Sequence, residues 1–181
     1  SAHGAVGAVW HQMMAMGGGM GLEVDIRAFF DTVDKAKLRE LLDQRVRDGV
    51  IRRTIDKWLR AGVMEGGVIR ASAIGTPQGG VVSPMLANIY LHHVMDRWFE
   101  EQVRPKLVGQ AFLIRYCDDA VLVFSSERDA RRVMRALPKR CAKYGLELHP
   151  DKTRIVSFRR PCHGEDIGQG RGRTGGSFDF L

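Results

Sequence analysis

Apolar and polar residues follow helical spacing in several parts of the chain. The segments expected to be helical are 2–16, 35–46, 50–61, 85–102 and 127–144. The second and third would form a helical hairpin that turns at Asp48–Gly49, and the first would end in a run of three glycines. The fourth is long and only partly amphipathic.

Local signals mark where some of these helices begin and end. Asp31 and Thr32 are candidates for a helix start. Ser83, which precedes a proline, and Ser126 would supply hydroxyl caps for the two later helices. Pro138 predicts an interruption of the last helix, because proline lacks the backbone N–H that a helix interior needs.

Two segments show the pattern of β-strands. Residues 22–26 alternate apolar and acidic side chains, which puts Glu23 and Asp25 on the same face of a half-buried strand. Residues 112–124 contain two runs of apolar, β-favouring residues around a Tyr-Cys-Asp-Asp centre. This pattern predicts two short strands joined by a tight turn.

The remaining segments complete an α+β fold. Further short strands are expected at 146–148, 155–158 and 178–181, a hairpin within 62–76, and loops at 76–80 and 159–177. The last of these loops is rich in Gly and Arg, and we expect it to be flexible and basic. The order of elements predicts a single domain over 1–181, with helices on one face of a small antiparallel sheet.

Composition narrows the class of protein. Of the 181 residues, 44% are hydrophobic, which suits one globular domain with a core. Lys and Arg outnumber Asp and Glu by 28 to 21, a net charge of +7 that permits a polyanionic partner. No apolar run reaches the roughly eighteen residues of a membrane span, and the start shows no export signal. Three irregularly spaced cysteines argue against disulfides and zinc, so we expect a cytoplasmic protein.

Asp118 and Asp119, in the turn of the 112–124 hairpin, are the first candidates for chemistry. Adjacent carboxylates beside apolar strands repel each other, and a divalent cation with a preference for oxygen, Mg²⁺ or Mn²⁺, would remove that cost. If the 22–26 strand pairs beside the hairpin, Asp25 joins them, and two metal ions about 4 Å apart can activate a 3′-hydroxyl and stabilise a leaving pyrophosphate. A purely polar turn is the alternative interpretation, because Asp is common in turns.

Four sequence blocks occur in the order seen in reverse transcriptases. They are LEVDIRAFFDTVD at 22–34, GTPQGGVVSPMLANIYL at 75–91, RYCDD at 115–119 and GLELHPDKT at 145–153. With them the chain resembles the group II intron-encoded, maturase-type branch over its whole length. The resemblance implies RNA-directed DNA polymerase activity, two Mg²⁺ ions or Mn²⁺ in their place, and a right-hand fold of which this chain is the palm with part of the fingers.

The resemblance also implies roles for individual residues. Asp25, Asp118 and Asp119 would bind the two metal ions. Lys152 would lie near the triphosphate or the primer end, where a cation offsets the charge on the leaving pyrophosphate. An ordinary surface lysine is the alternative interpretation for Lys152.

Two further positions would contact substrate. Phe29 matches the bulky residue under the sugar that favours deoxynucleotides, with Phe30 as the other candidate for this gate and a core aromatic as the alternative interpretation. Gln78 matches the residue near the incoming nucleotide and template, in a loop whose glycines allow close backbone approach; a plain turn is its alternative. Arg115 is either a solvated strand charge or a substrate contact.

The chain departs from the family pattern in two ways. Cys117 stands where the family commonly has Ala, and since Cys is also small we expect the hairpin to persist. Family members carry further fingers sequence before this chain's first block and a helical thumb or maturase region after its last. We therefore expect a piece of a larger protein that lacks the thumb.

These observations support three hypotheses. The first is an RNA-directed DNA polymerase core from a group II intron-type retroelement, with an RNA template, a DNA primer, deoxynucleoside triphosphates and intron RNA as partners. The second is an RNA-binding maturase fragment or an inactive polymerase-like scaffold. The third, an RNA-templated RNA polymerase, is disfavoured by the bulky Phe29 and the Tyr-Cys-Asp-Asp centre.

Overall fold

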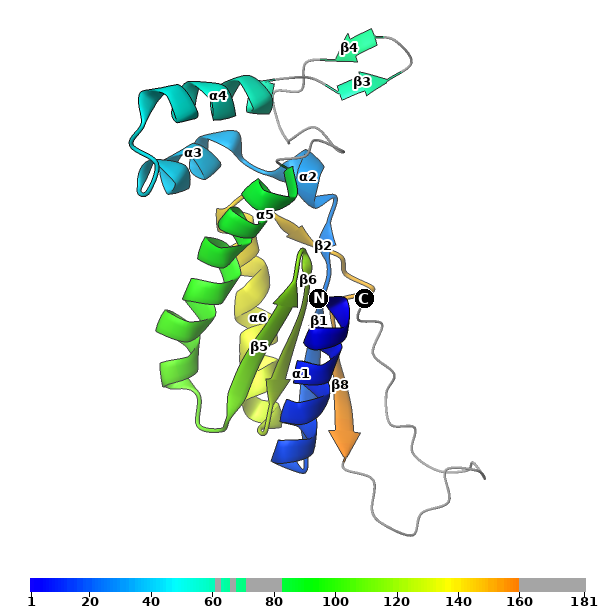
Figure 1. Cartoon of the computed structure of the whole chain (residues 1–181). Coiled ribbons are helices and arrows are strands. Elements are labelled where there is room, and N and C mark those ends of the chain that lie inside the picture. Colours follow the sequence, from blue (N-terminus) through cyan, green and yellow to red (C-terminus); the bar gives the residue numbers. More distant parts are fainter. Residues whose placement is uncertain (61–62, 66–67, 71–82, 160–181) are drawn as a thin grey trace.

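A four-stranded antiparallel sheet in the order β5-β6-β1-β8 forms the centre of the molecule (Figure 1). Its strands are β1 (Gly18–Val24), β5 (Ala111–Tyr116), β6 (Asp119–Phe124) and β8 (Arg154–Arg159). The computed structural model describes residues 1–60, 63–65, 68–70 and 83–159. The sheet and the helices packed on it confirm the predicted α+β class.

β1 and β6 are the buried centre of this sheet. Residues 120–124 of β6 are each at most 1% exposed, because this strand carries apolar side chains on both faces. β1 begins at Gly18, earlier than the predicted start at residue 22, because its first residues already pair with β8. A side chain at Gly19 would overlap the carbonyl oxygen of Phe124, so glycine permits the close approach of β1 and β6 here.

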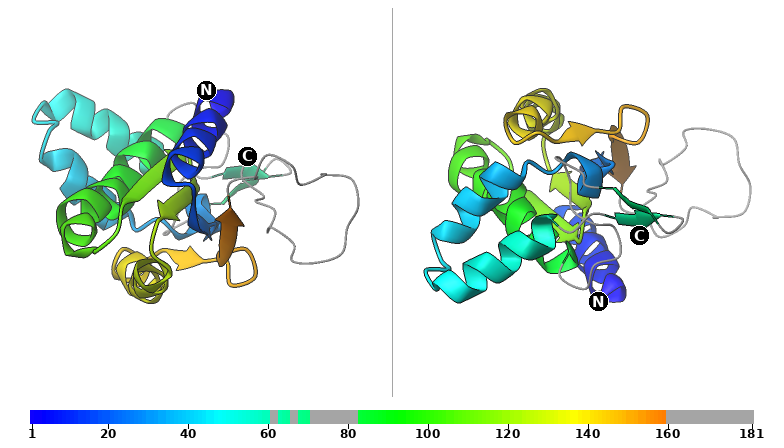
Figure 2. Two further views of the ribbon diagram at one scale, coloured as in Figure 1. Left: turned by 90° about the horizontal axis from the view of Figure 1, so that it is seen from below. Right: turned by 90° about the horizontal axis from the view of Figure 1, so that it is seen from above.

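Helices cover both faces of the sheet, so the predicted one-sided arrangement is wrong. On one face α1 (Ala2–Met16) packs Val9 against Val121, Val123 and Phe158. On the other face lie α5 (Ser83–Leu91) and α6 (Glu127–Lys143), which share a larger core with Leu122. The views along the sheet show α1 and α6 on opposite sides of it (Figure 2). A strand that is apolar on both faces needs cover on both.

Local signals place some helix ends and misplace others. α1 ends at Gly17, whose left-handed φ of 71° confirms the predicted glycine stop. Ser126 caps α6 as predicted, accepting from a backbone amide of the first turn. The interruption predicted at Pro138 is absent, and α6 continues through it. Buried Leu137 and Cys141 hold the helix to the core on both sides of the proline.

The predicted helical hairpin is present with different boundaries. Its elements are α3 (Lys35–Asp43) and α4 (Gly49–Arg60), and the short α2 (Phe29–Thr32) precedes them. Asp31 and Thr32 lie inside α2, which begins at Phe29, so the prediction that a helix starts at them is wrong. Asp34 caps α3 by accepting from two backbone amides. The Asp48 carboxylate accepts from two amides in the first turn of α4 and confirms the turn there.

The helix predicted at 85–102 is continuous but changes its winding. After α5 come two π-helical segments and a short 3₁₀ turn: η1 (His92–Asp96), η2 (Phe99–Val103) and η3 (Arg104–Lys106). The Arg140 guanidinium of α6 donates to the carbonyl oxygens of His93 and Val94, each at 3.0 Å, and so stabilises the first wide turn. Among the described residues, no helix has the length and apolarity to cross a membrane.

Two small strand pairs are separate from the main sheet. β2 (Ile26–Arg27) pairs with β7 (Glu147–Leu148), and β3 (Val63–Glu65) pairs with β4 (Val68–Arg70), which confirms the predicted hairpin within 62–76. Arg159, predicted to open the basic loop, is the last residue of β8. The loop predicted at 76–80, the rest of the loop at 159–177 and the strand at 178–181 lie outside the described residues.

A buried carboxylate fastens the start of α6 to the segment that enters β5. Asp129 is 2% exposed, and its Oδ2 accepts from the amides of Val108 and Gly109, each at 2.9 Å. Hydrogen bonds to a carboxylate are stronger than neutral ones, and the N-terminus of a helix favours negative charge. Asp129 therefore determines where the chain enters the β5–β6 hairpin.

Replacing this carboxylate should destabilise the fold strongly. We expect Asp129→Ala to lower the free energy of unfolding by about 2–4 kcal/mol, because two backbone amides lose their charged acceptor. Glu127→Ala is the matched control in the same helical turn: it removes only an exposed pair with Arg131 and should cost at most about 0.5 kcal/mol. Urea unfolding of both variants measures the difference, and equal losses would contradict the anchoring role.

Candidate functional site

The β5–β6 hairpin places Asp118 and Asp119 at one end of the sheet. Tyr116 pairs with Asp119, so the turn consists of Cys117 and Asp118 alone. Cys117 has a φ of 57°, and positive φ at the first of two loop residues is the pattern of a type II′ turn. The predicted hairpin is confirmed, with Asp119 as the first residue of β6 and not a turn residue.

Asp25 reaches the same end of the sheet from β1. Val24, the last residue of β1, pairs with Ala120, so continuing this antiparallel register by one residue sets Asp25 opposite Asp119. The backbone of Asp25 is held there, since its carbonyl oxygen accepts from the amide of His149 at 2.9 Å. The predicted convergence of strands at this end is therefore present in the backbone.

Asp119 is subject to the charges of the other two aspartates. Partial burial raises the pKa of Asp119 above its ordinary value, and the neighbouring charges of Asp118 and Asp25 raise it further. Lys152 acts in the opposite direction on the same carboxyl. Asp25, Asp118, Asp119 and Lys152 together are called the aspartate site below.

Lys152 forms an ion pair with Asp25. Its Nζ is 2.9 Å from Asp25 Oδ2, with side-chain exposures of 64% for the lysine and 28% for the aspartate. Lys152 lies between β7 and β8 in the chain, and β8 is the edge strand that pairs with β1. It therefore approaches Asp25 from that edge of the sheet. Its ammonium group offsets part of the negative charge that Asp25 and Asp118 place near Asp119.

The donor chemistry of this site suits a hard divalent cation. The charges of Asp118 and Asp25 disfavour ionisation of Asp119, so added positive charge would stabilise this carboxylate, and carboxylate oxygens are the ligands that Mg²⁺ and Mn²⁺ prefer. Among the described residues, however, no three His, Cys, Asp or Glu side chains are already arranged to hold an ion. A cation at Asp25 would compete with Lys152 for that carboxylate.

Of the other predicted substrate contacts, Phe29 is buried, and the rest lie outside the described structure. Phe29 is 3% exposed and packs edge-to-face on Tyr90, with ring centroids 6.4 Å apart, as a core aromatic does. The side chain of Phe30 and all of Gln78 lie outside the described residues. Which phenylalanine contacts the sugar, and what Gln78 contacts, stay predictions.

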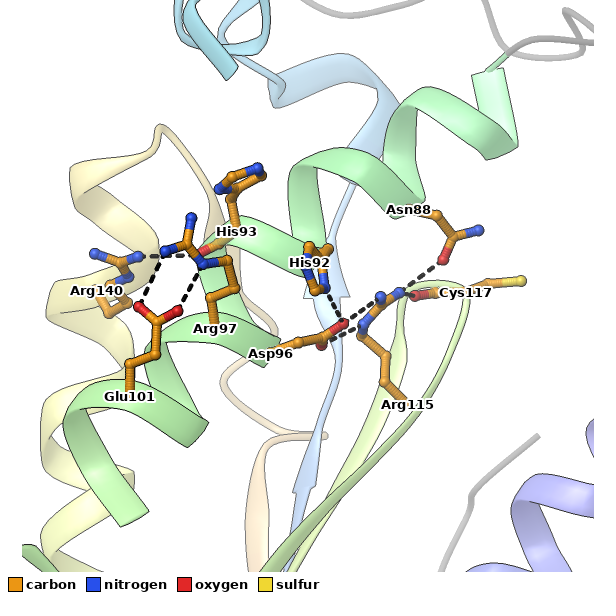
Figure 3. Close-up of polar contacts among 9 residues, drawn as sticks. All are labelled: Asn88, His92, His93, Asp96, Arg97, Glu101, Arg115, Cys117 and Arg140. Carbon is orange, nitrogen blue, oxygen red and sulfur yellow. Dashed lines mark hydrogen bonds and ion pairs between the residues drawn. The ribbon is translucent and has the colours of Figure 1, made fainter. Parts of the chain in front are cut away.

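Sequence reasoning missed the partners of Arg115. This side chain is 11% exposed and donates to both carboxylate oxygens of Asp96, each at 2.8 Å (Figure 3). It is therefore not the solvated charge that was one of the two predictions, and the other, a substrate contact, stays a prediction. A signal did exist: Asn88, His92 and Asp96 follow one another at four-residue intervals on one helix, a polar line facing an arginine on a largely apolar hairpin.

Comparisons with known proteins agree with this geometry. The model of the family described as reverse transcriptase (RNA-dependent DNA polymerase) matches residues 12–180. The comparison with curated proteins gave no match.

Among solved structures, the chain is similar to telomerases of two yeasts. For Candida tropicalis telomerase with a TWJ fragment of telomeric RNA, the TM-score is 0.63 at 13% identity, covering 93% of this chain and 31% of that one. For apo telomerase from Candida tropicalis, truncated from its C-terminal domain, the TM-score is 0.60 at 14% identity, covering 91% and 35%. For Candida albicans telomerase with a TWJ fragment, it is 0.60 at 14% identity, covering 92% and 31%.

These likenesses show a shared fold, and the chain spans about one third of the length of the telomerase chains. The fold, the aspartates at the end of β1 and β6, and the family match over residues 12–180 point the same way. The chain belongs to the reverse transcriptase (RNA-dependent DNA polymerase) family.

Proposed function

We propose that this chain is the palm, with part of the fingers, of an RNA-directed DNA polymerase that adds deoxynucleotides to a primer 3′-hydroxyl. The observation that carries the proposal is the meeting of Asp25, Asp118 and Asp119 at one end of the sheet in a member of the reverse transcriptase family. An RNA template, a DNA primer and deoxynucleoside triphosphates are its proposed partners.

The three aspartates are the proposed ligands of two Mg²⁺ ions, or of Mn²⁺ in their place. When bound, such a pair lowers the pKa of the 3′-hydroxyl and stabilises the charge of the leaving pyrophosphate. The chain's own part is to hold Asp119 on a rigid buried strand and Asp118 in a two-residue turn. Lys152 would exchange the Asp25 carboxylate for phosphate oxygens of the substrate, which carry the same sign of charge.

A group II intron-type origin is the narrower part of the proposal. Its support is the sequence: the RYCDD block at 115–119 and the GLELHPDKT block at 145–153 resemble that branch. Intron RNA is the additional partner that this origin proposes.

A second candidate function, RNA binding by a maturase-type fragment, is favoured by the outer face of α6. Its cations at three- and four-residue spacing are Arg128, Arg131, Arg132, Arg135 and Lys139, all exposed. Between Arg128 and Lys139 this basic face extends about 16 Å along the helix. The opposite face of α6 is buried against the core, so the cations point away from it. A row of cations of this length fits a phosphate backbone.

Loss of Asp118 should abolish primer extension. We expect Asp118→Asn to reduce the rate on an RNA-templated DNA primer at least about 100-fold, the effect of removing one group that stabilises charge in the transition state. Asp151→Asn, an exposed aspartate next to Lys152, is the control and should extend normally. A folded Asp118→Asn protein with undiminished Mg²⁺-dependent extension would sink the proposed function.

Loss of Asp119 should stabilise the metal-free protein. Because the pKa of Asp119 is raised in the fold, the native state binds more protons than the unfolded state, and stability falls as pH rises through that range. At pH 7 with a chelator, Asp119→Asn should therefore be more stable than wild type, by up to about 1 kcal/mol in a partly hydrated site.

This gain should shrink as the pH is lowered below the ordinary range of an aspartate, where both states are protonated. Mg²⁺ at pH 7 should stabilise the wild type more than the variant, since binding to the native state alone raises its stability. Thermal melts with and without Mg²⁺ at both pH values measure this. A variant less stable than wild type at pH 7 in chelator would contradict the electrostatic account.

Neutralising the α6 cations separates RNA affinity from catalysis. Replacing Arg128, Arg132, Arg135 and Lys139 with Gln should lower the slope of log affinity against log salt by roughly three for single-stranded RNA. Arg97→Gln, on a different helix and paired with Glu101, is the control. An unchanged slope would show that α6 does not contact RNA phosphates.

A further inference from the structure

A polar cluster links the turn of the aspartate site to the long helix beside it. Arg115 Nε and one terminal nitrogen donate to the two oxygens of Asp96, and the other terminal nitrogen donates to Asn88 Oδ1 at 2.8 Å and to the carbonyl oxygen of Cys117 at 2.6 Å (Figure 3). Arg115, Asp96 and Asn88 are called the Arg115 clamp below. Its only main-chain acceptor in the hairpin is the turn residue directly before Asp118.

That acceptor is the position in the turn where the backbone is strained. Cys117 is one of two non-glycine residues with positive φ in the described structure. Such a conformation persists only when its surroundings determine it, and a left-handed cysteine gains nothing from its own side chain. A hydrogen bond from a guanidinium to the Cys117 carbonyl fixes the orientation of the peptide plane that leads into Asp118.

The helix side of the clamp is itself held from two directions. Asp96 ends η1, and His92 one turn earlier lies 3.3 Å from its carboxylate. Arg140 of α6 donates to two carbonyl oxygens of the same segment, while Val94 and Met95 within it are buried. The backbone of η1, and with it Asp96, is therefore held in place, since its π-helical turn is hydrogen-bonded to α6 and packed into the core.

We propose that Arg115 is a positioning residue for the aspartate pair: anchored by Asp96 and Asn88, it holds the Cys117–Asp118 turn in the geometry that presents Asp118 and Asp119 together. The role of the aspartates rests on the proposed function. The bidentate pair with Asp96 orients the Arg115 guanidinium. Because the group is planar and two of its nitrogens are bonded to Asp96, the position of its third nitrogen is fixed. In this role Arg115 acts through the turn and not through a contact with a reacting group.

A neighbouring ion pair provides a matched comparison. Arg97 donates to both carboxylate oxygens of Glu101, at 2.8 and 3.2 Å, on the same long helix. In Figure 3 this pair lies on the side of the helix near Arg140 and away from Cys117. It is an arginine–carboxylate pair like that of the clamp but makes no contact with the turn. Variants of this pair therefore show the effect of losing an ion pair while the turn keeps its contacts.

The first test measures the turn directly and needs no catalytic activity. Arg115→Lys keeps the charge but cannot bond two carboxylate oxygens and a carbonyl at once, and Asp96→Asn keeps the shape but removes the charge. In both variants, amide hydrogen exchange at residues 117–119 should speed up at least tenfold, with exchange in α6 unchanged. Arg97→Lys and Glu101→Gln should leave residues 117–119 as in wild type. Unchanged exchange at the turn in both clamp variants would overturn the proposal.

The second test concerns catalysis and follows if wild type extends a primer and Asp118→Asn does not. The clamp variants should then lose roughly 10–100-fold in kcat, as is typical when a support of a metal ligand is removed, and need more Mg²⁺ for half-maximal rate, with KM for the nucleotide little changed. The double variant with Arg115→Lys and Asp96→Asn should have a kcat no lower than that of the less active single variant, since the two residues act as a unit. Wild-type kcat and Mg²⁺ dependence in folded clamp variants would overturn the positioning role while leaving the proposed function standing.

Conversely, if wild type extends no primer but the turn loosens as expected, the proposed function fails while the clamp's hold on the turn remains. The two failures are therefore distinguishable. Circular dichroism melts of every variant confirm that each is folded before either test is read.

Discussion

The register between β1 and β6 is the constraint on which the rest of the structure depends. β6 is buried on both faces, and burying a Val, Leu or Phe side chain contributes about 1.5–3 kcal/mol. Because the two strands are antiparallel and Val24 faces Ala120, the same pairing that forms the core brings Asp25 opposite Asp119. A slip of one residue would turn the apolar side chains of β1 to the wrong face, so the core enforces the position of the carboxylates.

Two cations beside the aspartates do different work because of where they lie. Lys152 is largely exposed and touches a carboxylate, so its ion pair contributes little to stability and can be exchanged for another partner. Arg115 is largely buried and binds a carboxylate that is not part of the aspartate site, so its charge is already balanced and it can bond a backbone carbonyl firmly. Lys152 can therefore change partners, whereas Arg115 keeps its bonds to Asp96 and to the backbone of the turn.

What could be predicted from sequence was mostly what local pattern determines. The Tyr-Cys-Asp-Asp hairpin, the glycine end of α1 and the Ser126 cap depend on residues close in the chain, and the structure confirms them. Pro138 was misleading because tertiary packing of α6 outweighs one missing hydrogen bond. Arg115 was not matched with Asp96 because the two lie nineteen residues apart on different elements. The four-residue spacing of polar residues marks one face of the helix but does not say which side chain that face meets.

The arrangement of charge also constrains how a nucleic acid can approach this fold. At the aspartate site burial raises the pKa of Asp119 and the charges of Asp118 and Asp25 raise it further, and the same carboxylate charges repel an anion. Phosphate chemistry there needs added positive charge, of which Lys152 supplies one unit within the described residues. Under the proposed function, affinity for a polyanion would come from other surfaces, and the exposed cations of α6 lie on the side of the sheet opposite α1. Under the proposed function, binding and catalysis use different surfaces: the basic face attracts the strand, and the divalent ions make the acidic end accessible to it.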